Sequence, residues 1–173
     1  MRSPKLRFGV EERKLALAHS TFLPDSCNDV PVPMHVPFIA SLLAGVLGFL
    51  CALHVFWAFG GRLGSVSVIP HVDGRPAFLP TKGMTLVVAG WLAGAAFVAL
   101  VQGAVVPIPV HPVLPKVASI VIGMIFLFRA AGEFKLVGFS KSVRGTTFAT
   151  WDTWFFSPLC VLMGAGFLVI ARR

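Results

Sequence analysis

The sequence predicts an all-α, polytopic membrane protein in which four transmembrane helices form an antiparallel bundle. Hydrophobic residues make up 56% of the chain and charged residues only 13%, which is about half the charged share of an average soluble domain. Four apolar runs contain no Asp, Glu, Lys or Arg, at residues 38–59, 84–106, 117–128 and 154–170. About 20 such residues cross a ~30 Å hydrocarbon layer as a helix. These observations predict a membrane fold.

The chain divides into a polar, basic N-terminal tail, residues 1–36, and a transmembrane domain, residues 37–173. The tail lacks a signal-peptide pattern, because the charged residues Glu11 to Lys14 interrupt it where an apolar stretch should follow. We therefore expect the first spanning helix to act as the insertion signal. Two interpretations of the tail stay open: a disordered terminus, or a segment that becomes ordered on a neighbouring subunit.

The first two helices are predicted at about 37–59 and 81–106. Pro37 suits the first turn of a helix, and Gly60-Gly61 is a typical helix end. Between the two helices, Val66–Ile69 and Pro76–Leu79 flank the tight-turn pair Asp73-Gly74. This pattern predicts a small hairpin or ordered loop at the membrane face.

The third and fourth helices are predicted at about 114–131 and 151–171, with a proline-rich turn at 107–112 before the third. The third run is short, so its ends must reach into the interface or be shielded by neighbouring helices. The fourth contains Pro158. A helix starting at Pro158 would be too short to span the membrane, so we expect it to start earlier and to bend mildly at the proline.

Small residues recur four positions apart on three of the predicted helices. This spacing lets membrane helices approach closely. It has two interpretations, a dimer face or packing inside this one bundle. The candidate packing glycines are Gly45, Gly90, Gly94 and Gly123.

The distribution of Lys and Arg indicates an orientation. Among residues near the spans, the side of the loops 62–83 and 129–153 carries seven basic residues, and the side of the termini carries three. Basic residues favour the cytoplasmic side. The sequence therefore favours cytoplasmic loops 62–83 and 129–153, with both termini outside.

Polar residues that are unusual for a membrane protein gather at this loop side. His54 lies ~9 Å inside the end of the first helix, Arg129 and Glu133 are one helical turn apart, and Asp152 starts the fourth helix. Two interpretations stay open. The first is a polar pocket formed by His54, Trp57, Arg129, Glu133 and Asp152. In the second, Arg129 pairs with Glu133 or Asp152 to hold the loop down, and His54 donates to a backbone carbonyl or to a loop residue.

The sequence predicts no catalytic set, metal site or cofactor. Cys27, Cys51 and Cys160 form no C-x-x-C pair. A haem held by two histidines would need a second histidine at the depth of His54, and no other predicted span contains one. The net charge of +8 lies in the tail and loops, which favours anionic lipid headgroups or an acidic subunit as partners. Nucleic acid is not expected.

Several segments carry a resemblance to a known family. The runs 54–61 and 129–134, followed by Ser157-Pro158-Leu159-Cys160, resemble an uncharacterised family of small bacterial membrane proteins, a domain of unknown function with four spans. Its Arg-x-x-Gly-Asp-Phe motif corresponds to residues 129–134 here, with Glu133 in place of the aspartate. The resemblance covers about residues 38–168 and implies the four-span fold without implying an activity.

Two functions from different classes are expected from these features. The first is a non-catalytic accessory or structural subunit of a larger membrane complex, with membrane lipids and other membrane subunits as partners. The alternative is a membrane oxidoreductase, or a quinone- or lipid-binding protein, that uses the polar pocket at the loop side.

Overall fold

The computed structural model describes residues 33–64, 69, 71–72, 75–76 and 80–173. Within these residues, four helices are long and apolar enough to cross a membrane. They are α2 (His35–Ala58), α4 (Lys82–Gln102), α5 (Val113–Ala131) and a continuous helix, Thr147–Ile170, made of α6 (Thr147–Trp151), the π-helix η1 (Asp152–Phe156) and α7 (Ser157–Ile170). This confirms the predicted four-helix, all-α class and fits an integral membrane protein.

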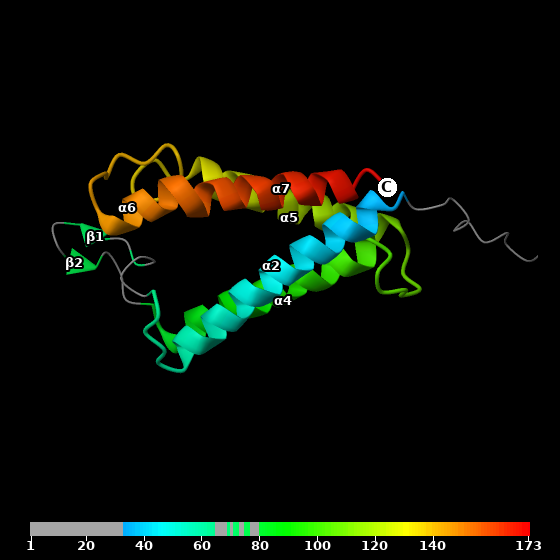
Figure 1. Cartoon of the computed structure of the whole chain (residues 1–173), viewed down its shortest axis with the longest axis horizontal. Helices are drawn as coiled ribbons and strands as arrows, with labels where there is room; N and C mark the ends of the chain where they lie inside the picture. The colour runs from blue at the N-terminus through cyan, green and yellow to red at the C-terminus, as the bar shows by residue number, and fades with distance from the viewer. Residues whose placement is uncertain (1–32, 65–68, 70, 73–74, 77–79) are drawn as a thin grey trace, which may run out of the picture. The chain divides into compact units, whose positions relative to one another are not determined.

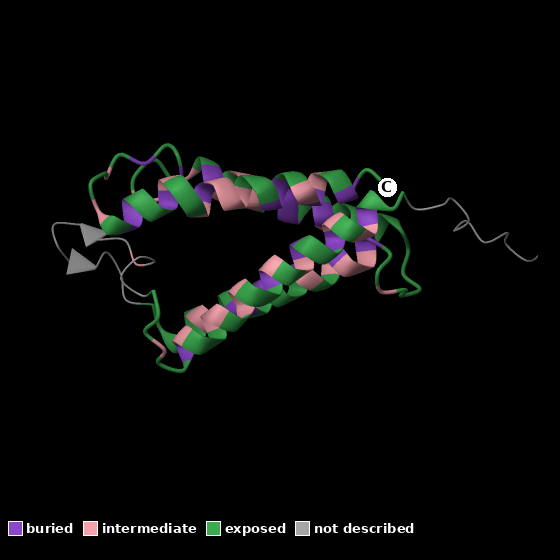
Figure 2. Ribbon diagram, viewed as in Figure 1, coloured by how far each residue is buried: buried purple, intermediate pink, exposed green. Residues whose placement is uncertain are grey.

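The helices pack mainly in two pairs, α2 with α4 and α5 with α7 (Figure 1). The apolar core joins the pairs (Figure 2) and is drawn from particular halves of the helices. These are the N-terminal half and middle of α2 and α5 and the middle and C-terminal half of α4 and α7, including Leu43, Leu47, Ala99, Phe167 and Ile170. The core therefore lies towards the end of the bundle that carries the 103–112 connection and the C-terminus.

One of the four candidate packing glycines lies at a close helix crossing. A Cβ atom on Gly123 of α5 would lie 3.1 Å from the carbonyl oxygen of Gly164 on α7, and one on Gly164 would lie 2.9 Å from the carbonyl oxygen of Gly123. Gly45, Gly90 and Gly94 have open space where a Cβ would stand. Small residues thus bring α5 and α7 together, whereas the other three glycines lie on open helix faces.

Helix α4 ends earlier than the predicted residue 106. A Cβ on Gly103 would overlap the side chain of Ala40, and Ala104 has a φ of 55°, a left-handed conformation that ends a helix. The buried Gln102 side chain donates from Nε2 to the carbonyl oxygen of Ile170 at 3.0 Å. Close packing against α2 and this bond fix the end of α4 at Gln102.

The fourth helix passes Pro158 through a wider turn. Pro158 has no N–H and so leaves the carbonyl of Trp154 without its usual donor. The structure has a π-helical turn, η1, directly before the proline, in which the Ser157 N–H donates to the carbonyl of Asp152. A single π turn within an α-helix is often found at a functional site. Here it starts at Asp152.

A small antiparallel hairpin follows α2. Its strands are β1 (His71–Val72) and β2 (Arg75–Pro76), with His71 opposite Pro76 and Val72 opposite Arg75. The sequence predicts a small hairpin or an ordered loop here, with strand segments at 66–69 and 76–79, and the structure has a hairpin whose strands are two residues each. Its predicted turn at Asp73-Gly74 and most of the predicted strand residues lie outside the described residues, as does the tail up to residue 32.

Candidate functional site

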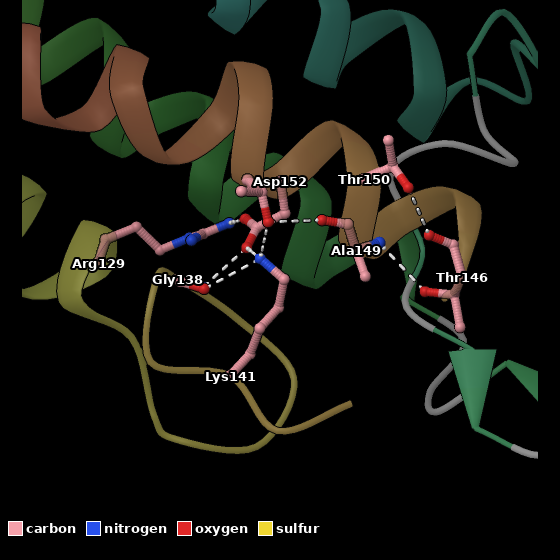
Figure 3. Close-up of polar contacts among 8 residues, drawn as sticks. Arg129, Gly138, Lys141, Thr146, Ala149, Thr150 and Asp152 are labelled. Carbon is pink, nitrogen blue, oxygen red and sulfur yellow. Dashed lines mark hydrogen bonds and ion pairs between the residues drawn. The ribbon is translucent and has the colours of Figure 1, made fainter. Parts of the chain in front are cut away.

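Asp152 is the centre of a buried polar cluster at the loop-side end of α5 and the fourth helix. Its side chain is fully buried. Oδ1 accepts a hydrogen bond from Nη2 of Arg129 at 3.0 Å, while Oδ2 accepts from Nζ of Lys141 at 2.9 Å and from the backbone N–H of Gly138 at 2.8 Å (Figure 3). The carboxylate thus has three donors, two of which are cationic.

Lys141 uses its whole hydrogen-bonding capacity inside the cluster. Its side chain is 3% exposed, and Nζ donates to Asp152, to the carbonyl oxygen of Gly138 at 3.0 Å and to Oγ1 of Thr153 at 2.6 Å. An ammonium group has three N–H donors, so none is left for a ligand. Lys141 therefore has a structural role, in which it joins the loop to the fourth helix.

The loop after α5 delivers these groups by folding back onto the helix end. The N–H groups of Phe139 and Ser140 donate to the carbonyls of Ala130 and Ala131, at 2.9 and 3.2 Å. These bonds satisfy carbonyls that a helix C-terminus leaves without partners. Gly132 and Gly138 both have positive φ, and their backbones touch, so a Cβ on either would overlap the other. Only glycine fits this crossing.

The start of the fourth helix positions the carboxylate. Thr146 caps α6, because its Oγ1 accepts a hydrogen bond from the N–H of Ala149 at 3.1 Å. Thr153 donates from Oγ1 to the carbonyl of Ala149 at 2.9 Å and accepts from Lys141. The cap fixes where the helix begins and hence which residue of the first turns enters the cluster.

The cluster carries one negative and two positive groups, a surplus of one positive charge. Ionised groups at membrane depth are costly unless they are paired and hydrogen-bonded. Here Asp152 is paired twice, and its other hydrogen bond comes from the backbone. This arrangement suits a fixed clamp between α5, the loop and the fourth helix better than it suits a general base, because three donors already hold the carboxylate.

Of the five residues predicted for a polar pocket, the structure brings two together. Arg129 and Asp152 form an ion pair, whereas Glu133 is exposed and has no hydrogen bond or ion pair within the described residues. Of the two predicted ion pairs, Arg129–Asp152 therefore forms and Arg129–Glu133 does not.

The other two predicted residues form a separate group near the end of α2. His54 Nδ1 lies 2.8 Å from the carbonyl oxygen of Leu50, and its ring packs edge-on against Trp57 at 5.2 Å. Trp57 donates from Nε1 to the carbonyl of Leu63 at 2.7 Å. Within the described residues, no hydrogen bond or ring contact joins this group to Arg129 or Asp152.

Sequence reasoning missed Lys141 and Gly138. Nothing in the local sequence around Lys141 distinguishes it from the other basic residues of the loops. Gly138 had a weak signal, since glycine is the default residue where a tight turn needs a positive φ. Within the described part of the chain, no group of three His, Cys, Asp or Glu residues is placed to hold a metal ion.

The fold and the cluster together define a small four-span membrane protein whose loop-side end is fastened by a buried Arg–Asp–Lys cluster. The chain belongs to a family described as proteins of unknown function, DUF3995, whose model matches residues 47–167. The match includes every member of the cluster and supports the resemblance to an uncharacterised domain family. Neither the curated proteins nor the solved structures include a match to the chain.

Proposed function

We propose that this protein is a non-catalytic accessory or structural subunit that packs against other subunits of a larger membrane complex in the bacterial cytoplasmic membrane. The observation that carries the proposal is the low burial of its spans. In the most apolar window of each span, only 22% to 28% of the residues are buried. Every span also exposes large apolar side chains, including Phe49, Trp91, Phe128 and Leu162. Much apolar surface is therefore left for lipid and for partner helices.

The polar chemistry supports the same proposal. Asp152 and Lys141 form hydrogen bonds with each other and with the loop, as is expected of residues that hold two segments together. The alternative, an oxidoreductase or quinone- or lipid-binding protein with its pocket around His54, Trp57, Arg129, Glu133 and Asp152, remains a prediction from the sequence. The contacts of His54 and Trp57 do not favour it, because both residues bond to their own helix and the segment just after it.

Cross-linking within native membranes tests the proposal. A photoreactive residue at Gly90 or Gly94, where a side chain meets open space, is expected to give an adduct of one defined mass with a different polypeptide. The control is a photoreactive leucine analogue in place of Leu47 of α2, which is fully buried, so that it should react only within the chain. Adducts to lipid alone, or only to a second copy of this chain, would contradict the proposal of a larger complex.

We further propose that the loops 62–83 and 129–153 face the cytoplasm. The seven basic residues near the spans on this side support this orientation. Arg144 is exposed in the second of these loops, so a cysteine in its place, in a chain without its native cysteines, provides a reporter. It should resist a membrane-impermeant thiol reagent in intact cells and react after lysis. Labelling in intact cells would show that this loop lies outside the cytoplasm and would contradict the proposed orientation.

A further inference from the structure

A pocket of about 200 Å³ lies between the loop after α5 and the start of the fourth helix. Phe139 and Arg144 line it from the loop, and Thr150 and Trp154 line it from the helix. It presents both polar and apolar surface, whereas a groove between α4 and α5 presents only apolar surface. The pocket beside the loop therefore has groups that can select a polar ligand.

Both charged side chains in the lining of this pocket, Lys141 and Arg144, are cations. Lys141 is bonded within the cluster, so it contributes charge but no free donor. The carboxylate of Asp152 is fully buried, and both of its oxygens accept hydrogen bonds. The segment 129–153 contains four basic and two acidic residues, a net positive charge. An anionic ligand is therefore favoured over a neutral or cationic one.

Arg144 has donors that the protein does not use. Its side chain is exposed, and it has no hydrogen bond or ion pair within the described residues. A guanidinium has five N–H donors in a planar fork that matches two oxygens of one phosphate group. The hydroxyl of Thr150 donates to the carbonyl of Thr146 at 3.3 Å, which is long for a hydroxyl donor. It can exchange this bond for a shorter one to a phosphate oxygen.

The pocket lies at the level of the lipid headgroups. The fourth helix, Thr147–Ile170, has 24 residues, which is ~36 Å at the usual helical rise, whereas the hydrocarbon layer is ~30 Å thick. Its first turn therefore extends beyond the hydrocarbon. Trp151 and Trp154 are 48% and 80% exposed there, and tryptophan is typical of the membrane–water interface. The phosphate groups of phospholipids lie at this same level.

We propose that this pocket binds a phosphate group, with two phosphate oxygens on the Arg144 guanidinium and a third on the Thr150 hydroxyl. The volume is below that of most sites for drug-sized ligands and suits one headgroup or one ion. Two sources of phosphate reach this level, a phospholipid and free phosphate in the adjoining water. Among phospholipids, the net positive charge of the segment favours an acidic headgroup over a zwitterionic one.

Native mass spectrometry of the full-length chain in a neutral detergent tests the lipid source, with phosphatidylglycerol and phosphatidylcholine offered in equal amounts. The unmodified protein should retain phosphatidylglycerol with about fivefold preference, the effect of one basic residue near a membrane surface. Arg144→Gln should remove the preference. Lys135→Gln is the matched control, because Lys135 is an exposed cation of the same loop that does not line the pocket. It should keep the preference.

Inorganic phosphate, added to the same lipid-free protein, tests the soluble source. A rise of the melting midpoint with phosphate concentration, lost in Arg144→Gln and kept in Lys135→Gln, would assign the pocket to free phosphate. If Arg144→Gln and Lys135→Gln behaved alike in both experiments, the proposal would be overturned.

A second pair of variants tests the pocket without changing a charge. Thr150→Phe fills the pocket and should remove whichever effect the unmodified protein shows. Its matched control is Thr147→Phe, because both threonines are exposed on the first turns of the fourth helix but Thr147 does not line the pocket. Equal binding by these two variants would show that Arg144 attracts anions from the open surface, and this result would also contradict a phosphate site in the pocket.

Discussion

Replacing Asp152 with alanine is expected to lower the free energy of unfolding by about 3–5 kcal/mol, the usual effect of removing one partner from a buried ion pair. The change leaves Lys141, which is 3% exposed, without its counter-ion, and it leaves the Gly138 N–H without an acceptor. The thermal melting midpoint of the purified protein in detergent, followed by tryptophan fluorescence, should fall accordingly. This loss is the largest expected for any single substitution in the cluster.

The matched control for Asp152→Ala is Glu133→Ala, which removes a carboxylate from the same end of the protein. Glu133 is exposed and has no hydrogen bond or ion pair within the described residues, so its removal should leave the melting midpoint nearly unchanged. Equal melting of the two variants would mean that the Asp152 cluster contributes little to stability and that the loop is held by other contacts.

The spans were predictable because they depend on one physical requirement, that lipid-facing helices carry few charges. Predicted and observed bounds of α2 and α5 agree within two residues. The end of α4 was not predictable, because the apolar run continues to Val106 while the helix stops at Gln102. Its end depends on a contact between Gly103 and Ala40, and hydropathy carries no information about such a tertiary contact.

The start of the fourth helix also depends on contacts with other segments, about which hydropathy carries no information. The helix is predicted to begin at about residue 151, with Asp152 at its start, whereas the observed helix begins at Thr147. An acidic residue at this depth is tolerated because Arg129 and Lys141 reach it from other segments. The sequence did indicate an irregularity of the helix at Pro158. The structure has a π turn there, and local sequence does not distinguish a π turn from a bend.

The candidate site was predictable only in part. Arg129 and Asp152 were identifiable because an ionised residue at a helix end in a membrane protein requires a partner. The choice of Asp152 over Glu133 depends on the path of the loop, which turns at Gly132 immediately after α5 and directs the chain back towards the fourth helix. Lys141 was not predictable, because seven basic residues lie near the spans on this side and only the fold selects one of them.

Replacing Gly132 with alanine is expected to give the second-largest loss of stability. Gly132 has φ 88° and ψ 178°, a region open almost only to glycine, where another residue costs about 1–3 kcal/mol. A Cβ would also overlap the carbonyl oxygen of Val137 and lie 2.7 Å from the Cα of Gly138, and overpacking of this kind costs about another 1–3 kcal/mol. Moving Gly138 would in turn stretch its 2.8 Å bond to Asp152. The melting midpoint in detergent should fall well below that of the unmodified protein.

Gly145→Ala separates the two causes of this loss. Gly145 also has a positive φ, of 86°, but a Cβ there would meet nothing within 4 Å. It should therefore show the conformational cost alone, and Gly132→Ala should melt at a lower temperature than Gly145→Ala by the amount that the overlap contributes. If the two variants melted together, the contact between Gly132 and Gly138 would not be tight in the folded protein. The position of Gly138 beside Asp152 would then have to depend on Lys141 and the returning backbone hydrogen bonds.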